Sequence, residues 1–142
     1  MGYTLEGLGL ARPSVAHQRI ARNIVINWYN MQGFEKIEAF QEGTANFKTT
    51  GEDVPDVIFV DVSTQKVVVS IEIEKHFRSK LKRKVADLLD TFKHKEVFVY
   101  DYIRELWYRC TWDKKNKEMI VEKGVSKSKE LSVDFKDYLE LE

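Results

Sequence analysis

The sequence has very few cysteines and prolines, no excess of either charge and no long apolar run. Its single cysteine, Cys110, excludes an intramolecular disulfide and a cysteine-based zinc cluster, as is usual in a reducing cytosolic setting. Lys plus Arg number 23 and Asp plus Glu number 23, so no whole-molecule field draws the protein toward nucleic acid or membrane. The longest apolar stretches have the length of strands, far short of a bilayer span. Met1–Arg12 lacks the pattern of a signal peptide, and we therefore expect a cytoplasmic protein with no membrane partner.

The rest of the composition describes a chain that can bury a core. With 142 residues, 43% of them hydrophobic, it has the usual size of one globular domain, which we expect to span residues 1–142. Ser14 is a candidate N-cap, and apolar residues recur at helical spacing from Ala21 to Trp28. This pattern predicts a helix over about residues 15–32, ended by Gly33. A strand over 34–42 and a polar loop over 43–53 follow.

Two β-branched runs give the most secure prediction of structure. Val57–Val62 and Val67–Glu74 are joined by four residues, which indicates an antiparallel hairpin. From Phe77 the period changes to that of a helix, and its expected buried face comprises Leu81, Val85, Leu88 and Phe92. A strand over 96–102 and a second hairpin over 105–122 come next. Three apolar residues of the tail are compatible with either a short helix or a final strand: Phe135, Tyr138 and Leu139.

The order of these elements is α-β-β-β-α-β. It predicts an α/β fold in which one mixed β-sheet is flanked by helices on both faces.

Three acidic residues are candidates to meet at one end of the first hairpin. Asp56 precedes its first strand, and Glu72 and Glu74 lie in its second. Because side chains alternate across a strand, the two glutamates share one face. A register that pairs Asp56 with either glutamate brings all three carboxylates together, whereas a slip of one residue sends Asp56 to the other face. Such a group is costly unless a cation lies between its members, and Mg²⁺ or Mn²⁺ prefers these hard oxygen ligands.

The simpler alternative is that Asp56 ends a turn and that the two glutamates are solvated, paired with Lys75 or Arg78. For an arbitrary pair of glutamates this alternative is the better one. What favours the metal site is a resemblance to a known family, which a short motif and the order of the elements carry.

Pro55-Asp56 before one strand of a hairpin, and Glu72-Ile73-Glu74 near the end of the next, resemble the motif of the PD-(D/E)XK nuclease superfamily. The order of elements over roughly residues 14–101 is also similar to the core of that superfamily. The resemblance implies a restriction-endonuclease-like αβββαβ core and hydrolysis of phosphodiester bonds with Mg²⁺ or Mn²⁺ as cofactor. It also implies that Asp56 and Glu72 are metal ligands. His17, the glutamate triplet and the basic helix that follows also resemble the nuclease-like domains of plasmid replication and mobilisation proteins.

The chain departs from the superfamily pattern at the lysine position, which Glu74 occupies. A glutamate cannot supply the positive charge of lysine, but it can act as a general base or as a ligand of a second metal ion. Lys75 is the next residue and is a further catalytic candidate, although it points to the opposite face of an ideal strand. Lys80 and Lys84 of the second helix are alternative donors of positive charge.

A second departure concerns the first helix, which lacks the acidic ligand that the superfamily often places there. It carries His17 instead, a residue that is more often a cap or a packing residue than a catalytic one. Glu38 and Glu42 of the following strand are candidate accessory ligands.

Basic residues without any acid follow the glutamate triplet directly, in Lys75–Lys84. We expect four of them to face solvent or a phosphate backbone: Arg78, Lys80, Arg83 and Lys84. The plain alternative for such a run is a solvated helix face.

These features favour a metal-dependent nuclease, and we expect DNA to be its nucleic-acid partner and substrate. A second hypothesis is a catalytically inactive nuclease-like module that binds nucleic acid or a protein partner, and a third is a subunit that needs a separate DNA-recognition partner. Cleavage of both strands of a duplex would favour a homodimer.

Overall fold

The computed structural model describes residues 14–41 and 54–141, and the predicted loop over 43–53 and Glu42 lie outside them. Its elements in chain order are α1 (Val15–Gln32), β1 (Ile37–Gln41), β2 (Val57–Asp61), β3 (Lys66–Glu74), α2 (Ser79–Asp90), β4 (Glu96–Asp101), β5 (Leu106–Asp113), β6 (Glu118–Lys123), β7 (Lys127–Ser128), β8 (Val133–Asp134) and the 3₁₀ helix η2 (Phe135–Tyr138). The predicted helices and both hairpins are confirmed, with ends that differ by a few residues.

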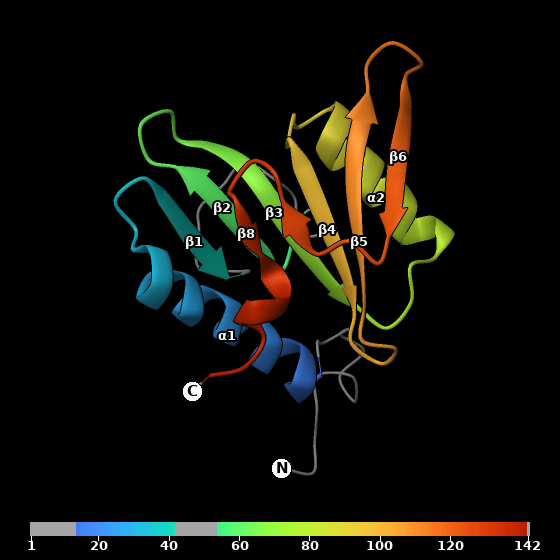
Figure 1. Ribbon diagram of the computed structural model, residues 1–142. Coiled ribbons are helices and arrows are strands. Elements are labelled where there is room, and N and C mark those ends of the chain that lie inside the picture. Colours follow the sequence, from blue (N-terminus) through green and yellow to red (C-terminus); the bar gives the residue numbers. More distant parts are fainter. Residues whose placement is uncertain (1–13, 42–53, 142) are drawn as a thin grey trace, which may run out of the picture.

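Six strands form one mixed sheet in the order β1-β2-β3-β4-β5-β6 (Figure 1). All neighbouring pairs are antiparallel except β3 and β4, which run parallel. A parallel pair needs a crossover connection, and α2 supplies it between these two strands. The predicted mixed sheet is therefore confirmed, and the crossover places the end of β3 beside the start of α2.

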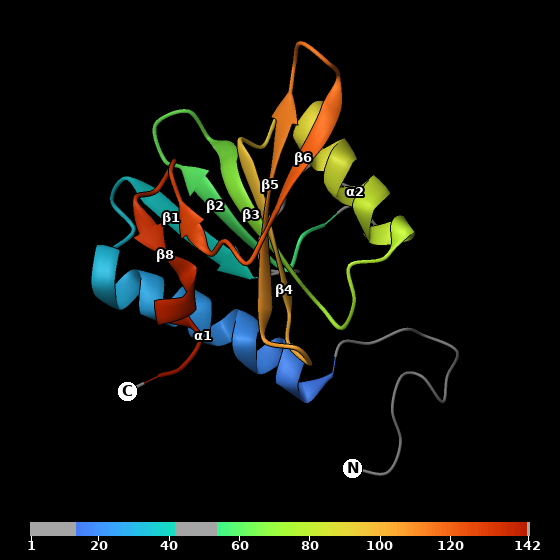
Figure 2. The same ribbon diagram turned by 45° about the vertical axis from the view of Figure 1, so that its right-hand side comes forward.

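The alternation of side chains along β3 assigns the two faces of the sheet to different helices. Val69, Ile71 and Ile73 lie in the core shared with α1. Ser70 and Glu72 are on the opposite face, which α2 covers through a smaller cluster that includes Val85 and Leu88 (Figures 1 and 2). Two polar residues thus interrupt the apolar surface under α2.

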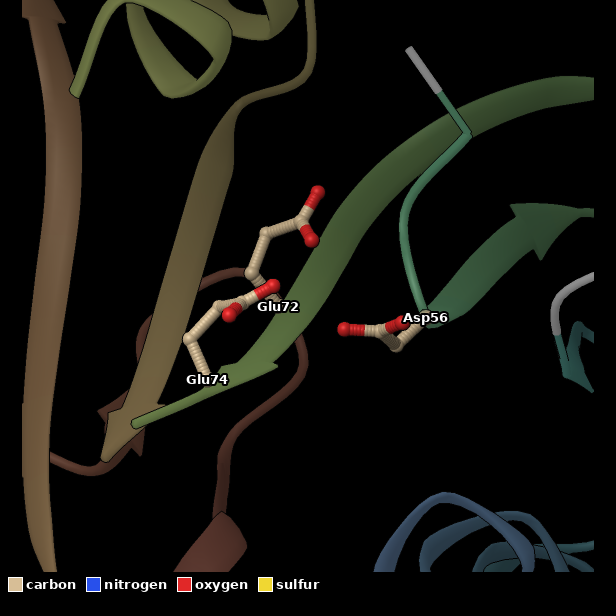
Figure 3. Close-up of side chains that lie close together, drawn as sticks. All are labelled: Asp56, Glu72 and Glu74. Carbon is tan, nitrogen blue, oxygen red and sulfur yellow. The ribbon is translucent and has the colours of Figure 1, made fainter. Parts of the chain in front are cut away.

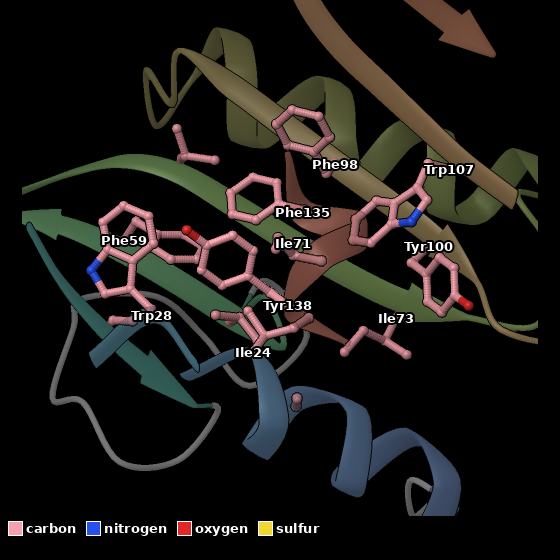
Figure 4. Close-up of a cluster of buried hydrophobic side chains, with 14 residues drawn as sticks. Ile24, Trp28, Phe59, Ile71, Ile73, Phe98, Tyr100, Trp107, Phe135 and Tyr138 are labelled. Atoms are coloured by element: carbon pink, nitrogen blue, oxygen red, sulfur yellow. The ribbon is translucent and has the colours of Figure 1, made fainter. Parts of the chain in front are cut away.

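The C-terminal segment completes the core on the α1 side. Its last residues form the short helix η2, which answers the question that the sequence left open between a helix and a strand. Phe135 is fully buried. The centroid of its ring lies 5.2 Å from that of Phe59 and 5.0 Å from that of Phe98, and Figure 4 shows the three rings together. Tyr138 is also buried, and the centroid of its ring lies 6.0 Å from that of Trp28. The tail is therefore an integral part of the larger core.

The buried carboxylate of Glu96 fastens the same segment to the sheet. Glu96 accepts hydrogen bonds from Nε of Arg109 at 2.6 Å, from the hydroxyl of Ser128 and from the backbone N–H of Lys129 at 2.9 Å. Arg109 also contacts Glu122 at 2.6 Å. Each buried charge thus has an opposite charge or several hydrogen bonds to offset its lost solvation.

One residue of the predicted core lies elsewhere. Phe92 is 38% exposed because α2 ends at Asp90, so that the helical period no longer directs this side chain toward the sheet.

The described part of the chain contains no helix that is both long and apolar enough to span a membrane.

Candidate metal centre

The register of β2 and β3 brings the three predicted acids together. Val57 pairs with Ile71, and Asp56, one residue earlier, therefore lies beside Glu72. One carboxylate oxygen from each of Asp56, Glu72 and Glu74 lies within 4.8 Å of the other two. Figure 3 shows both glutamates on β3, with Asp56 facing them from the start of β2. The register on which the sequence hypothesis depended is confirmed.

Asp56 is held between β3 and α1. Its Oδ2 accepts a hydrogen bond of 2.6 Å from the backbone N–H of Ile73, and its Oδ1 lies 3.0 Å from Nε2 of His17. His17 is in the first turn of α1, where its backbone N–H donates to the N-cap hydroxyl of Ser14 at 3.0 Å. His17 therefore belongs to the cluster as a contact of Asp56 and is buried there, which sequence pattern alone did not establish.

The cluster disfavours its own negative charge. Burial and the neighbouring carboxylate of Asp56 raise the pKa of Glu72 well above the ordinary value, although the charge of Lys84 opposes the rise. Burial and Asp56 also raise the pKa of Glu74. Glu72 is only 1% exposed and Asp56 6%, so water screens their repulsion poorly. A cation placed among these oxygens would relieve both effects.

Lys84 supplies part of that positive charge. Its Nζ lies 2.9 Å from Oε2 of Glu72, in an ion pair. The same ammonium donates a hydrogen bond of 3.2 Å to the backbone carbonyl of Val54, two residues before Asp56. Its side chain is only 22% exposed, so Lys84 does not lie in solvent with the other basic residues; it lies beside the acids, where the sequence offered it as an alternative donor of positive charge.

The reason lies in the helical period. Lys84 is three residues after Leu81 and four before Leu88, and residues at these spacings share a face of the helix. The buried stripe of α2 therefore includes position 84, and this spacing is the signal that distinguishes Lys84 from Lys80 as the lysine that reaches the acids. Arg78, Lys80 and Arg83 are exposed, as the sequence predicts.

Two other candidates that the structure describes are Lys75 and Glu38. Lys75 is exposed directly after β3 ends, and it forms no ion pair with another described residue. Glu38 pairs with Val60, four residues along β2 from Asp56, which corresponds to about 13 Å at the usual rise of a strand. The expectation that Glu38 is an accessory ligand is therefore wrong, because the antiparallel register places it toward the other end of β2.

The donor set fits a hard divalent cation. All three candidate ligands are carboxylates, which Mg²⁺ and Mn²⁺ prefer, and none is a thiolate or an imidazole. The two buried acids would form the inner wall of the site and the exposed Glu74 its solvent side.

The comparisons with known proteins place this arrangement in a fold. No protein-family model matches the sequence, and no curated protein matches it either. The structure is similar to the crystal structure of a candidate nuclease belonging to DUF820 from Anabaena variabilis, with a TM-score of 0.57 and 16% sequence identity. The similarity covers 91% of this chain and 83% of the other. The chain thus has the mixed α/β fold of that protein, a six-stranded sheet flanked by helices.

Proposed function

We propose that this chain is a metal-dependent nuclease of the PD-(D/E)XK type that hydrolyses phosphodiester bonds, with DNA as the preferred substrate. The observation that carries the proposal is the group of three carboxylates within 4.8 Å of one another, with a lysine ammonium 2.9 Å from one of them. The likeness of the fold to that of a candidate nuclease supports it.

Asp56 and Glu72 would hold Mg²⁺ or Mn²⁺, with Glu74 as a further ligand or as a general base. When bound, the ion would polarise the phosphodiester and lower the pKa of the attacking water. Glu74 suits a base because its pKa is raised and its side chain reaches solvent, from which water must enter. The contact with His17 and the N–H of Ile73 fix the orientation of Asp56, so this ligand needs little rearrangement.

Lys84 would take the part of the lysine that is missing from position 74. An ammonium beside the cluster can stabilise the negative charge that develops on the phosphate oxygens. This ammonium comes from α2 rather than from position 74 of β3. It still reaches the acids, because the crossover brings α2 over the end of β3. The glutamate at position 74 therefore does not by itself argue for lost catalysis.

The test is a cleavage assay on single- and double-stranded DNA and RNA, with Mg²⁺, Mn²⁺ or a chelator. We expect metal-dependent cleavage by the wild type and its loss in Asp56→Asn and Lys84→Ala. Glu38→Gln is a matched control, because it removes a carboxylate of β1 that lies away from the cluster. Binding of nucleic acid without cleavage under every condition would contradict the proposal and favour an inactive nuclease-like module.

A further inference from the structure

The turn between β4 and β5 lies against the same end of β3 as the acidic cluster. Asp101, the last residue of β4, is the cross-strand neighbour of Glu74. The backbone N–H of Tyr102 donates to the carbonyl of Glu74 at 3.1 Å. Figures 1 and 2 show this turn near the connection that leads from β3 to α2. Whatever the turn presents is therefore close to the candidate metal centre.

Asp101 holds Arg104 in place on this turn. Oδ1 of the fully buried Asp101 accepts hydrogen bonds of 3.0 Å from the backbone N–H groups of Ile103 and Arg104. Its Oδ2 accepts one of 2.8 Å from Nη1 of Arg104. One carboxylate thus fixes both the turn and its guanidinium, whose side chain remains 56% exposed.

The guanidinium also fixes His76, which follows Glu74 by two residues. Nη1 of Arg104 lies 2.8 Å from Nδ1 of His76. Because a guanidinium has only donors, Nδ1 must accept, and the ring in this contact carries its proton on Nε2. Both described contacts of the guanidinium use Nη1, which leaves the N–H groups of Nε and Nη2 for a ligand. The pair therefore offers several donors and a positive charge on one exposed surface.

We propose that Arg104 and His76 form a phosphate-binding site, which holds a phosphate of the substrate strand beside the bond that is cleaved. The identity of the ligand as a nucleic-acid phosphate rests on the proposed function. Guanidinium groups bind phosphate oxygens through two parallel hydrogen bonds, and Nε2 of His76 adds a third donor.

Electrostatics gives a reason for such a site here. Three carboxylates repel a polyanion, and cations must offset that repulsion on the surface where the strand lies. The exposed residues Arg78, Lys80 and Arg83 can do so from α2, and Arg104, whose guanidinium is also paired with Asp101, can do so from the turn between β4 and β5. A strand that crosses the end of β3 would then contact basic groups from two separate elements.

The first experiment tests the site without any need for catalysis. Inorganic phosphate is titrated into the wild-type protein at constant ionic strength, and NMR follows the Nε–H signal of Arg104 and the ring signals of His76. We expect saturable shifts of both, and none with chloride alone; in Arg104→Gln the ring signals of His76 should not shift. Absence of shifts in the wild type would overturn the site.

The second experiment measures affinity for labelled single- and double-stranded DNA by fluorescence anisotropy in chelator, at several salt concentrations. Loss of one phosphate contact should lower the slope of log affinity against log salt by about 0.7–0.9, so we expect this fall in Arg104→Gln. Arg104→Lys should keep the slope and lose affinity, because it keeps the charge without the planar fork. Lys66→Gln, at the other end of β3, is the control for loss of one exposed charge and should behave as the wild type.

The outcomes separate this inference from the proposed function. Unchanged affinity and slope in Arg104→Gln, with cleavage by the wild type intact, would overturn the phosphate site and leave the nuclease standing. Phosphate-dependent shifts in a protein that cleaves nothing would support the site and contradict the nuclease. Thermal melts of each variant show whether the protein still folds. If Arg104→Gln is destabilised, Arg104→Lys takes its place in the test, because lysine keeps the positive charge that pairs with Asp101.

Discussion

Replacement of Glu72 by glutamine tests the metal centre most directly, because it removes the ionisable carboxylate and keeps the shape of the side chain. The buried carboxylates of Asp56 and Glu72 each have an oxygen no more than 4.8 Å from the other's, and two unit charges at that limit repel by about 3.5 kcal/mol at an effective dielectric constant of about 20. Lys84 at 2.9 Å offsets this repulsion, but each buried ion also loses solvation worth several kcal/mol. The raised pKa of Glu72 shows that repulsion and lost solvation together outweigh the attraction to Lys84.

A bound divalent ion reverses that balance, so metal should stabilise the wild type and not the variant. At one hundred times its dissociation constant, an ion that binds only the folded state adds about 2.7 kcal/mol. For a chain of this size the melting temperature rises by roughly 3–4 °C per kcal/mol, which gives an expected rise of about 8–11 °C. Thermal melts with Mg²⁺, Mn²⁺ and chelator, and titration calorimetry, measure this effect. An equal rise in the wild type and in Glu72→Gln would refute the reasoning.

The same substitution makes a pH prediction for the metal-free protein. The folded state keeps the proton of Glu72 at pH values where the unfolded chain, with an ordinary pKa of 4.5, has released it. The free energy of unfolding should therefore fall as pH rises from 4.5 through the raised pKa of Glu72. In Glu72→Gln this part of the profile should be flatter. Urea denaturation in chelator at several pH values measures it, and identical profiles would contradict the assigned pKa shift.

Three further predictions concern other parts of the molecule. Glu74→Lys should lower metal-dependent cleavage if the glutamate is a base or ligand, whereas an active variant beside an inactive wild type would indicate a domain that lost catalysis. Replacing both Lys80 and Arg83 by alanine should lower the salt slope of DNA binding by about 0.7–0.9 per lost contact and leave the melting temperature nearly unchanged, since both are exposed; anisotropy and thermal melts test this. Phe135→Ala should cost about 3–5 kcal/mol by urea denaturation, because the ring is fully buried among aromatic residues, whereas the half-exposed Leu141→Ala should cost little.

Much of the fold could be predicted from local patterns. The helical spacing after Ser14, the β-branched runs around 57–74 and the change of period after Phe77 each depend on neighbours in the sequence, and each is confirmed. The alternation of side chains in a strand likewise put Glu72 and Glu74 on one face. These features follow from backbone geometry, which links residues only a few positions apart. The spacing of apolar residues therefore repeats with the period of a helix or a strand.

What the sequence could not decide was how separate elements meet. The register between β2 and β3 determined whether Asp56 joined the glutamates. The register between β1 and β2 likewise determined that Glu38 lies away from them. The contacts of His17 with Asp56 and of Arg104 with His76 join residues 39 and 28 positions apart, and no periodicity links such pairs. Lys84 turned inward because the crossover of α2 laid its buried stripe over a face of the sheet that carries an acid. Long-range contacts of this kind depend on how whole surfaces pack, and only the tertiary structure determines them.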